Sequence, residues 1–212
     1  MEVVSVNVGL PKDLLLHDRS VATGIFKSPV AGLVRVKALN LDGDQQADLT
    51  VHGGPDKAVY VYPSEHYPFW QRALSQNLGW GAFGENLTAA GLAEEAISIG
   101  DHLGIGTAVL QVTQPRLPCF KLAAKFQRED IIKRFLDSRR TGFYVRVLNE
   151  GALQAGDPIV VLQQEPEHVT IRELTDLYLT KQPERSRIDR VLSVKALATS
   201  WREHFTGLLL RT

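Results

Sequence analysis

The sequence is short of cysteine and has no excess charge of either sign. Cys119 is the one cysteine in 212 residues, which excludes an internal disulfide. Lys and Arg together number 24, as do Asp and Glu, so the formal net charge is zero. Proteins that bind polyanions carry a basic excess, so this balance argues against nucleic acid or an anionic membrane surface as the main partner.

Long apolar runs are missing as well. No stretch approaches the roughly 18 apolar residues that a membrane span requires. The first residues, Met-Glu-Val-Val-Ser-Val-Asn-Val, lack the basic and apolar regions of a signal peptide and predict a strand instead. A lone cysteine fits the reducing cytosol. We therefore expect a cytoplasmic protein without a membrane segment, long enough for one core with a small satellite.

The first 165 residues have the pattern of a mainly β protein. Short apolar or alternating runs, separated by glycine-containing turns, occupy residues 4–8, 32–41, 57–62, 107–112, 143–148 and 158–162. Such runs predict an antiparallel or mixed barrel rather than βαβ units. Gly100-Asp101 and Gly156-Asp157 each lead into an apolar run, which predicts two matching strand entries.

Helical patterns interrupt and then follow these strands. Ser64 is a candidate N-cap for a helix that runs to Leu74, and residues 119–136 predict a helix in two pieces. From Thr170 to Glu173 the sequence has the form of a capping box. We therefore predict a β-barrel with short helices over 1–165 and a small C-terminal helical domain over 168–212, which packs on the barrel or on a partner subunit because it is too small to be stable alone.

Cys119 has two interpretations. A lone cysteine commonly serves as a small buried apolar side chain. Pro115 and Pro118, however, stiffen the preceding loop, the following residues are helical, and Arg116 and Lys121 lie close in sequence. A cysteine in such a setting suits a soft metal ligand or a nucleophile. The residues alone leave both interpretations open.

Two glycine-rich segments are candidate binding loops. In residues 42–57, Gly53 and Gly54 would let backbone amides approach an anion, although the segment also suits a solvated connection between strands. In residues 79–88, Glu85 and Asn86 would hydrogen-bond the edge of a heterocycle, or the run is only an irregular connection.

Two further patterns carry less information. The histidines and Cys119 have no short spacing that would place two of them on one element, so a zinc site is not favoured. Arg146 lies mid-strand between Val145 and Val147, where it is either a solvated charge or an inward contact to an anion.

Several of these motifs occur together in a recognisable order. They are Asp44-xxx-Asp48-xxx-His52-Gly53-Gly54-xx-Lys57-Ala58-Val59-xx-Tyr62, Gly84-Glu85-Asn86-Leu87, Gly100-Asp101 and Pro115-Arg-x-Pro-Cys119-x-Lys121-Leu122. In order and spacing they resemble the MOSC domain over about residues 1–165. The segment from about 168 is similar to the three-helix C-terminal domain of the YiiM-like branch of that family.

The resemblance implies a β-barrel with short helices that binds a molybdenum–pterin cofactor, with Cys119 as the metal ligand. It implies His52 as a second catalytic residue, since histidine ordinarily titrates near neutral pH and can deliver protons. The cofactor-binding residues that it implies are Asp48, Gly53, Gly54, Lys57, Glu85, Asn86, Thr88, Arg116 and Lys121.

The implied activity is reduction of N-hydroxylated compounds, such as N-hydroxylated purines. The chain has no second cysteine, iron–sulfur motif or fused electron-transfer module, so we expect a separate protein to donate electrons. The alternative is a carrier that holds the cofactor, or sulfur as a persulfide on Cys119, without its own turnover. A homodimer is a further expectation, and no nucleic-acid or membrane partner is expected.

Overall fold

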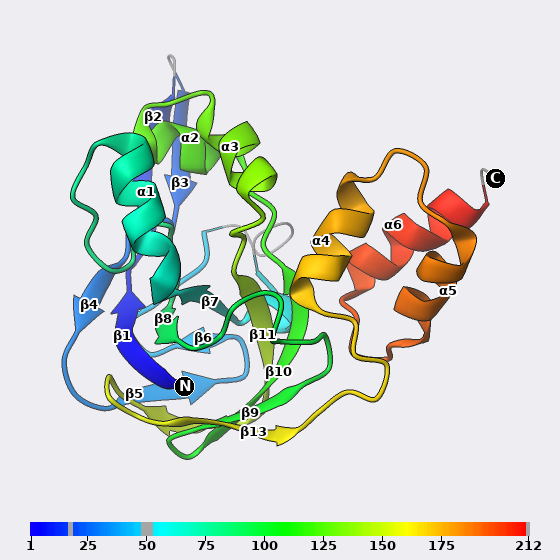
Figure 1. The fold of residues 1–212 in the computed structure, drawn as a ribbon. Coiled ribbons are helices and arrows are strands. Elements are labelled where there is room, and N and C mark those ends of the chain that lie inside the picture. The colour runs from blue at the N-terminus through cyan, green and yellow to red at the C-terminus, as the bar shows by residue number, and fades with distance from the viewer. Residues whose placement is uncertain (17–18, 48–52, 211–212) are drawn as a thin grey trace.

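The computed structural model describes residues 1–16, 19–47 and 53–210. Its largest element is an eight-stranded sheet, curled beneath a layer of short helices (Figure 1). In sheet order the strands are β13 (Ile159–Gln163), β9 (His102–Ile105), β10 (Ala108–Pro115), β11 (Phe143–Asn149), β7 (Val59–Pro63), β8 (Leu87–Ala90), β1 (Glu2–Val8) and β4 (Ser28–Val30). Neighbours are antiparallel except for β7 and β8, which are parallel.

Two smaller sheets complete the β structure. One contains β12 (Gly151–Leu153), β5 (Val34–Lys37) and β6 (Asn40–Leu41), and the other is the hairpin of β2 (Lys12–Leu16) with β3 (Arg19–Thr23). The fold is therefore mixed α/β with a large sheet.

The described strands do not close into a barrel, so the predicted barrel is not confirmed. β1 pairs with β8 along one edge, and residues 6–8 of its other edge pair with β4. Only the start of β1 reaches the opposite end of the sheet. There the Val3 amide donates to Asp157 O at 2.9 Å and the Gly156 amide donates to Val3 O at 2.7 Å. Because β4 occupies the rest of that edge, β13 cannot pair along the whole of β1.

The two Gly-Asp turns do enter matching strands, as predicted. Gly100 and Gly156 have φ angles of +100° and +89°, a conformation that glycine adopts without steric cost. The turns lead into β9 and β13, which pair antiparallel over Ile159 to Gln163.

Six α-helices occur in the described ranges, in two groups. The helices α1 (Tyr67–Leu74), α2 (Phe120–Phe126) and α3 (Ile131–Ser138) cover one end of the sheet, and α4 (Ile171–Leu179), α5 (Arg185–Ser193) and α6 (Thr199–Leu209) stand beside it (Figure 1). The prediction of two helical pieces after Cys119 is confirmed.

The predicted start of the first helix was wrong. Ser64 makes no side-chain cap and opens the 3-10 turn η2 (Ser64–His66) instead. The α-helix begins at Tyr67, which places Pro68 in the first turn. A proline is tolerated only there, so the proline rather than the serine sets the boundary.

The C-terminal helices, α4 to α6, pack on the sheet. One hydrophobic cluster contains Leu103 and Val112 from the sheet together with Leu174 and Trp201 from the helices. Thr170 caps α4 by accepting the Glu173 amide at 3.0 Å, as predicted, but the Glu173 carboxylate pairs with Arg190 instead of completing the capping box.

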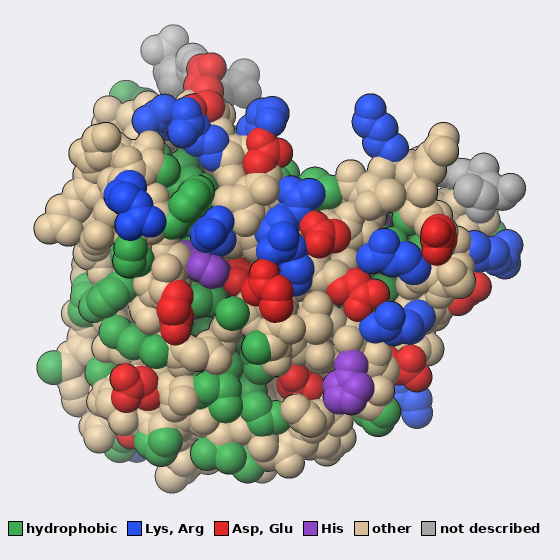
Figure 2. Space-filling model, viewed as in Figure 1, with side chains coloured by type: hydrophobic (Ala, Val, Ile, Leu, Met, Phe, Trp, Pro, Cys, Tyr) green, Lys and Arg blue, Asp and Glu red, His purple; other side chains and the backbone are tan. Residues whose placement is uncertain are grey.

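Charged side chains add to this contact. Arg139 pairs with Asp176 at 2.6 Å and Arg172 pairs with Glu95 at 2.7 Å. Figure 2 shows positive and negative side chains interspersed along the boundary between the main body and the C-terminal helices. None of the helices in the described ranges is long and apolar enough to cross a membrane.

A second, aromatic cluster lies under α1 to α3. It includes Tyr60 and Tyr62 of β7, Trp70 of α1, Phe83, and Phe135 of α3. The Trp70 and Phe135 rings stack with centroids 5.6 Å apart, and Tyr62 lies over Phe83 at 4.7 Å. This cluster forms the floor on which the candidate site is built.

Candidate functional site

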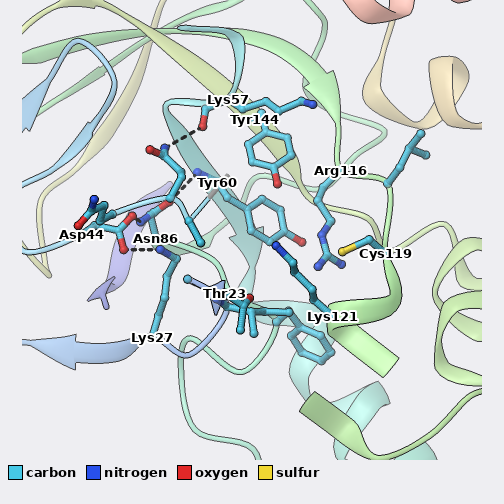
Figure 3. Close-up of a pocket in the computed structure, with 18 residues that line it drawn as sticks. Thr23, Lys27, Asp44, Lys57, Tyr60, Asn86, Arg116, Cys119, Lys121 and Tyr144 are labelled. Carbon is cyan, nitrogen blue, oxygen red and sulfur yellow. Dashed lines mark hydrogen bonds and ion pairs between the residues drawn. The ribbon is translucent and has the colours of Figure 1, made fainter. Parts of the chain in front are cut away.

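A pocket opens at the helix-covered end of the sheet (Figure 3). Its volume is about 660 Å³, part of which is open to solvent. The lining residues come from 23–27, 44–47, 57–60, 83–86, 116–121 and Tyr144. Segments far apart in the sequence therefore meet here, and they include most of the motifs described above.

Positive side chains are concentrated in the pocket. Lys27, Lys57, Arg116 and Lys121 line it, whereas Asp44 is the one carboxylate among its described lining residues. Burial lowers the pKa of Lys27, while the neighbouring Asp44 opposes that change, and burial also lowers the pKa of Lys57. The pocket is thus a local site of positive charge in a chain of zero net charge.

Arg116 is a buried cation that forms no salt bridge with the described residues. Its guanidinium lies over the rings of Tyr60 and Phe135, at 5.4 and 5.1 Å from their centroids. The residue is 5% exposed, and within the part of the chain that the structure describes its buried Nη1 has no hydrogen-bond partner. A buried cation without a paired anion is costly, so this geometry favours a bound anion.

The neighbouring tyrosines do not supply that anion. Burial raises the pKa of Tyr60 and of Tyr144, and Arg116 opposes the rise in both. Their hydroxyls therefore stay neutral at physiological pH. The Tyr60 hydroxyl is also occupied, since it donates to Thr141 O at 2.8 Å.

Cys119 brings a sulfur to the same pocket. It is partly exposed and directly precedes α2, in an extended backbone conformation with φ −124° and ψ 174°. Its carbonyl accepts the Leu122 amide at 2.9 Å, which fixes the start of the helix. Figure 3 shows the thiol beside the Arg116 guanidinium, with Lys121 on the same wall. The structure thus brings together Lys57, Arg116, Cys119 and Lys121, all of which were predicted from the sequence.

Asn86 also lines the pocket, but its amide is already used. Its Oδ1 accepts the Tyr60 amide at 3.0 Å, and its Nδ2 donates to Asp44 Oδ2 at 2.8 Å. Asp44 in turn accepts the Gly9 amide at 3.0 Å and pairs with Lys27. Asp44 and Asn86 therefore hold three segments of the wall in place.

Glu85 and Thr88 lie behind the wall rather than in it. Both are fully buried, and neither lines the pocket. Glu85 accepts hydrogen bonds from the amides of Gly81 and Phe83, at 2.9 and 3.0 Å, and from the hydroxyls of Tyr67 and Thr88. Burial raises the pKa of Glu85, and these hydrogen bonds oppose the rise. The side chains of Glu85 and Thr88 therefore support the 81–86 loop, and the predicted contact of these two residues with a cofactor stays a prediction.

The glycine pair precedes the short helix that carries Lys57. Gly54 has a φ of +90° and directly precedes η1 (Pro55–Lys57), but neither Gly53 nor Gly54 lines the pocket. Their role as anion contacts stays a prediction. Asp48 and His52 lie outside the described residues, so the predictions for them also stay predictions.

The predicted site residues did not include several polar residues that line the pocket, among them Lys27, Asp44, Tyr60 and Tyr144. Asp44 stands in the motif quoted above, which was the available signal. Lys27 and Tyr144 carry no local signal, because their partners are distant in sequence.

Comparison with known proteins identifies the family. Residues 48–160 match the MOSC domain, and residues 169–211 match the YiiM-like, 3-alpha helix domain. The chain belongs to the MOSC family. The MOSC match includes Lys57, Arg116, Cys119 and Lys121, whereas Lys27 and Asp44 precede it.

Relatives span nearly the whole chain. The protein YflK of Bacillus subtilis (strain 168) is 44% identical over 203 residues, which are 96% of this chain and 92% of YflK. The crystal structure of YiiM from Geobacillus stearothermophilus has a TM-score of 0.83 at 37% identity and covers 97% of both chains. The MOSC protein described here is thus similar to YiiM in both parts of its fold.

A third relative is much longer than this chain. The protein named "Reductase" of Gibberella moniliformis (strain M3125 / FGSC 7600) is 35% identical over 148 residues. These are 68% of this chain but 26% of that protein, so the similarity concerns about a quarter of the fungal protein.

Proposed function

We propose that this MOSC protein is an oxidoreductase that binds a molybdenum–pterin cofactor in the pocket and reduces N-hydroxylated compounds, such as N-hydroxylated purines. Membership of the MOSC family and similarity to a protein named reductase support the general class. Cofactor and substrate are our inference from the pocket and from the family resemblance.

One observation carries the proposal. Arg116, whose buried Nη1 has no partner among the described residues, lines a pocket that also holds Cys119 and Lys121. A molybdenum–pterin cofactor offers the groups that such a pocket lacks, because its phosphate end is anionic and its metal accepts a soft sulfur ligand. The residues present therefore fit the cofactor: Arg116, Lys121, Lys57 and Lys27 would hold the anionic end, and the Cys119 sulfur would bind the metal.

The chemistry then divides between cofactor and protein. When bound, the cofactor supplies the two electrons that removal of oxygen from an N–OH group consumes. Two protons are also consumed, and the products are the amine and water. Tyr60 and Tyr144 are unsuited to supply these protons, because burial raises their pKa. The protons would reach the substrate from solvent through the open side of the pocket, or from His52 if that prediction holds. Electrons would come from a separate donor protein.

The first test is metal and pterin content after expression in a host that makes the cofactor, with wild type beside Cys119→Ser. We expect stoichiometric molybdenum in wild type and its loss in the variant, with unchanged circular dichroism. Turnover of an N-hydroxylated purine is then measured with a chemical reductant as electron source. A Cys119→Ser variant that keeps its full molybdenum content would overturn the assigned role. Loaded wild-type protein without turnover would favour the carrier alternative.

A further inference from the structure

The contact between the sheet and α6 contains an unusual helix cap. Ala198 occupies the N-cap position and has no side-chain acceptor for the first amides of the helix. The missing acceptor comes from Asp56, 143 residues away in sequence, whose Oδ2 accepts the Thr199 amide at 3.1 Å. A carboxylate at this end also interacts favourably with the helix dipole.

The same carboxylate binds the sheet. Arg146 of β11 donates from Nη2 to Asp56 Oδ1 at 2.6 Å and to Ala196 O at 2.9 Å. Of the two sequence interpretations of Arg146, the inward contact to an anion is therefore the one observed. Asp56 and Arg146 together link the sheet to residues 196–199, just before and at the start of α6.

Thr113 of β10 forms a second connection at this point. It is fully buried, and its hydroxyl lies 2.7 Å from Asp56 O and 3.0 Å from Tyr144 O. Its carbonyl accepts the Ala198 amide at 3.3 Å. The junction of Asp56, Thr113 and Arg146 thus contacts the C-terminal helices on one side and the backbone of Tyr144 on the other.

This junction lies directly behind the pocket. Asp56 and Lys57 are consecutive residues of η1, and Gln46 holds the pocket side of that turn by donating from Nε2 to Lys57 O at 3.4 Å. Figure 3 shows Lys57 and Tyr144 on the same part of the pocket wall. Both residues line the pocket. A displacement of Asp56 would therefore move the backbone that carries Lys57.

We propose that the C-terminal helices set the position of the Lys57–Tyr144 wall through Asp56, which makes Asp56 a positioning residue for the anion that the pocket binds. The identity of that anion rests on the proposed function, but the mechanical coupling does not. The C-terminal helices do not need this junction in order to stay attached to the sheet. α4 is held separately, by backbone hydrogen bonds at Ile97 and Ile99 and by the Arg172–Glu95 pair.

The test compares wild type with Asp56→Ala, Asp56→Asn and the control Glu95→Ala. The asparagine keeps an oxygen acceptor for the Thr199 amide, and the control removes a carboxylate from the same interface that does not line the pocket. Hydrogen exchange is measured by mass spectrometry on peptides that cover residues 53–62 and 196–205. The acylation rate of Lys57 is measured against that of Lys133, an exposed lysine of α3 with its side chain 81% accessible. Molybdenum and pterin content are measured on the same preparations.

We expect Asp56→Ala to accelerate exchange on the order of 10-fold in both segments, since it removes hydrogen bonds to a charged group. Acylation of Lys57 should change relative to Lys133, and cofactor affinity should fall on the order of 10-fold, as for other residues that orient a binding group. Asp56→Asn should restore a large part of each effect, and Glu95→Ala should leave residues 53–62 as in wild type.

Faster exchange in residues 196–205 alone, with residues 53–62 and Lys57 unchanged, would overturn the proposal and leave Asp56 as a helix cap only. The same holds if Glu95→Ala reproduces every effect of Asp56→Ala. If wild type contains no cofactor, the proposed function fails, while exchange and acylation still decide whether Asp56 positions the wall.

Discussion

Replacement of Arg116 by methionine tests whether the guanidinium binds a ligand or stabilises the fold. The change removes the charge and the unpartnered Nη1 but keeps an apolar side chain between Tyr60 and Phe135. A buried arginine that is paired with a carboxylate usually costs about 3–5 kcal/mol of stability when one partner is removed. No salt bridge of the described residues includes Arg116, although its guanidinium is buried.

Two contributions to stability therefore nearly cancel in Arg116→Met. The loss of two cation–π contacts costs about 0.5–2 kcal/mol each. The removal of a buried donor without a partner regains about 1–3 kcal/mol. Because the two ranges overlap, we expect the unfolding free energy of the cofactor-free protein to change by about 1 kcal/mol and to fall by no more than about 3 kcal/mol, where 1 kcal/mol is about 2–4 °C in Tm for a chain of this size.

Cofactor binding should respond much more strongly. A hydrogen bond to a charged group is worth about 1.5–3 kcal/mol, which corresponds to a loss of roughly 10- to 150-fold in affinity. The assays are thermal unfolding of cofactor-free protein and titration of pterin content, with Lys133→Met as the matched control on an exposed site. A fall in stability of several kcal/mol with unchanged pterin content would refute the assignment and make Arg116 a structural cation.

Two further predictions concern the residues behind the wall. Thr88→Val removes a hydroxyl that donates to Glu85 and accepts from Asn7. We expect the unfolding free energy measured in urea to fall by about 1–2 kcal/mol, with unchanged cofactor content. Unchanged stability with a loss of cofactor would instead make Thr88 a direct cofactor contact. Lys125 of α2 donates from Nζ to Ile25 O at 2.9 Å and to Gly81 O at 3.0 Å. Burial lowers the pKa of Lys125 to about 8, so the unfolded chain binds this proton more tightly than the folded one. Wild type should therefore gain stability relative to Lys125→Met as the pH rises from about 8 to about 10.5. The same difference in unfolding free energy between the two proteins at both pH values, measured in urea, would contradict this expectation.

Local signals explain which parts of the fold were predictable. Pro118 and the apolar spacing after it gave the split helix, Thr170 gave the start of α4, and Gly100 gave a strand entry. Each of these depends on a few consecutive residues. The barrel prediction is not confirmed at β1, because closure depends on how β4 and β13 share one edge, and no local pattern encodes that competition.

The site residues also differ in whether a short stretch of sequence was enough to predict them. Cys119, Arg116 and Lys121 stand within six residues of one another, so one motif was enough to group them. Lys27 could not be found, because its partner Asp44 and the next contact in the wall, Asn86, come from separate segments. The role of Glu85 could not be read from the sequence for a different reason. A carboxylate in a glycine-rich loop can bind a ligand or accept hydrogen bonds from the loop itself, and only the structure reveals that the amides of Gly81 and Phe83 donate to it.

The zero net charge of the chain is compatible with an anionic ligand, because the charge of the pocket differs from that of the whole molecule. The 24 positive and 24 negative residues leave the chain without the overall basic excess that is typical of proteins that bind nucleic acid. Within the pocket, however, four cations face one carboxylate among the described lining residues, and that carboxylate is itself paired with Lys27. The remaining charge lies in a pocket that is only partly open to solvent, as is usual for small-molecule and cofactor sites. A chain that is neutral overall but has a positive pocket favours a compact anion as its ligand. Because the dielectric around Arg116 is low, each positive charge there attracts such an anion more strongly than a surface lysine would.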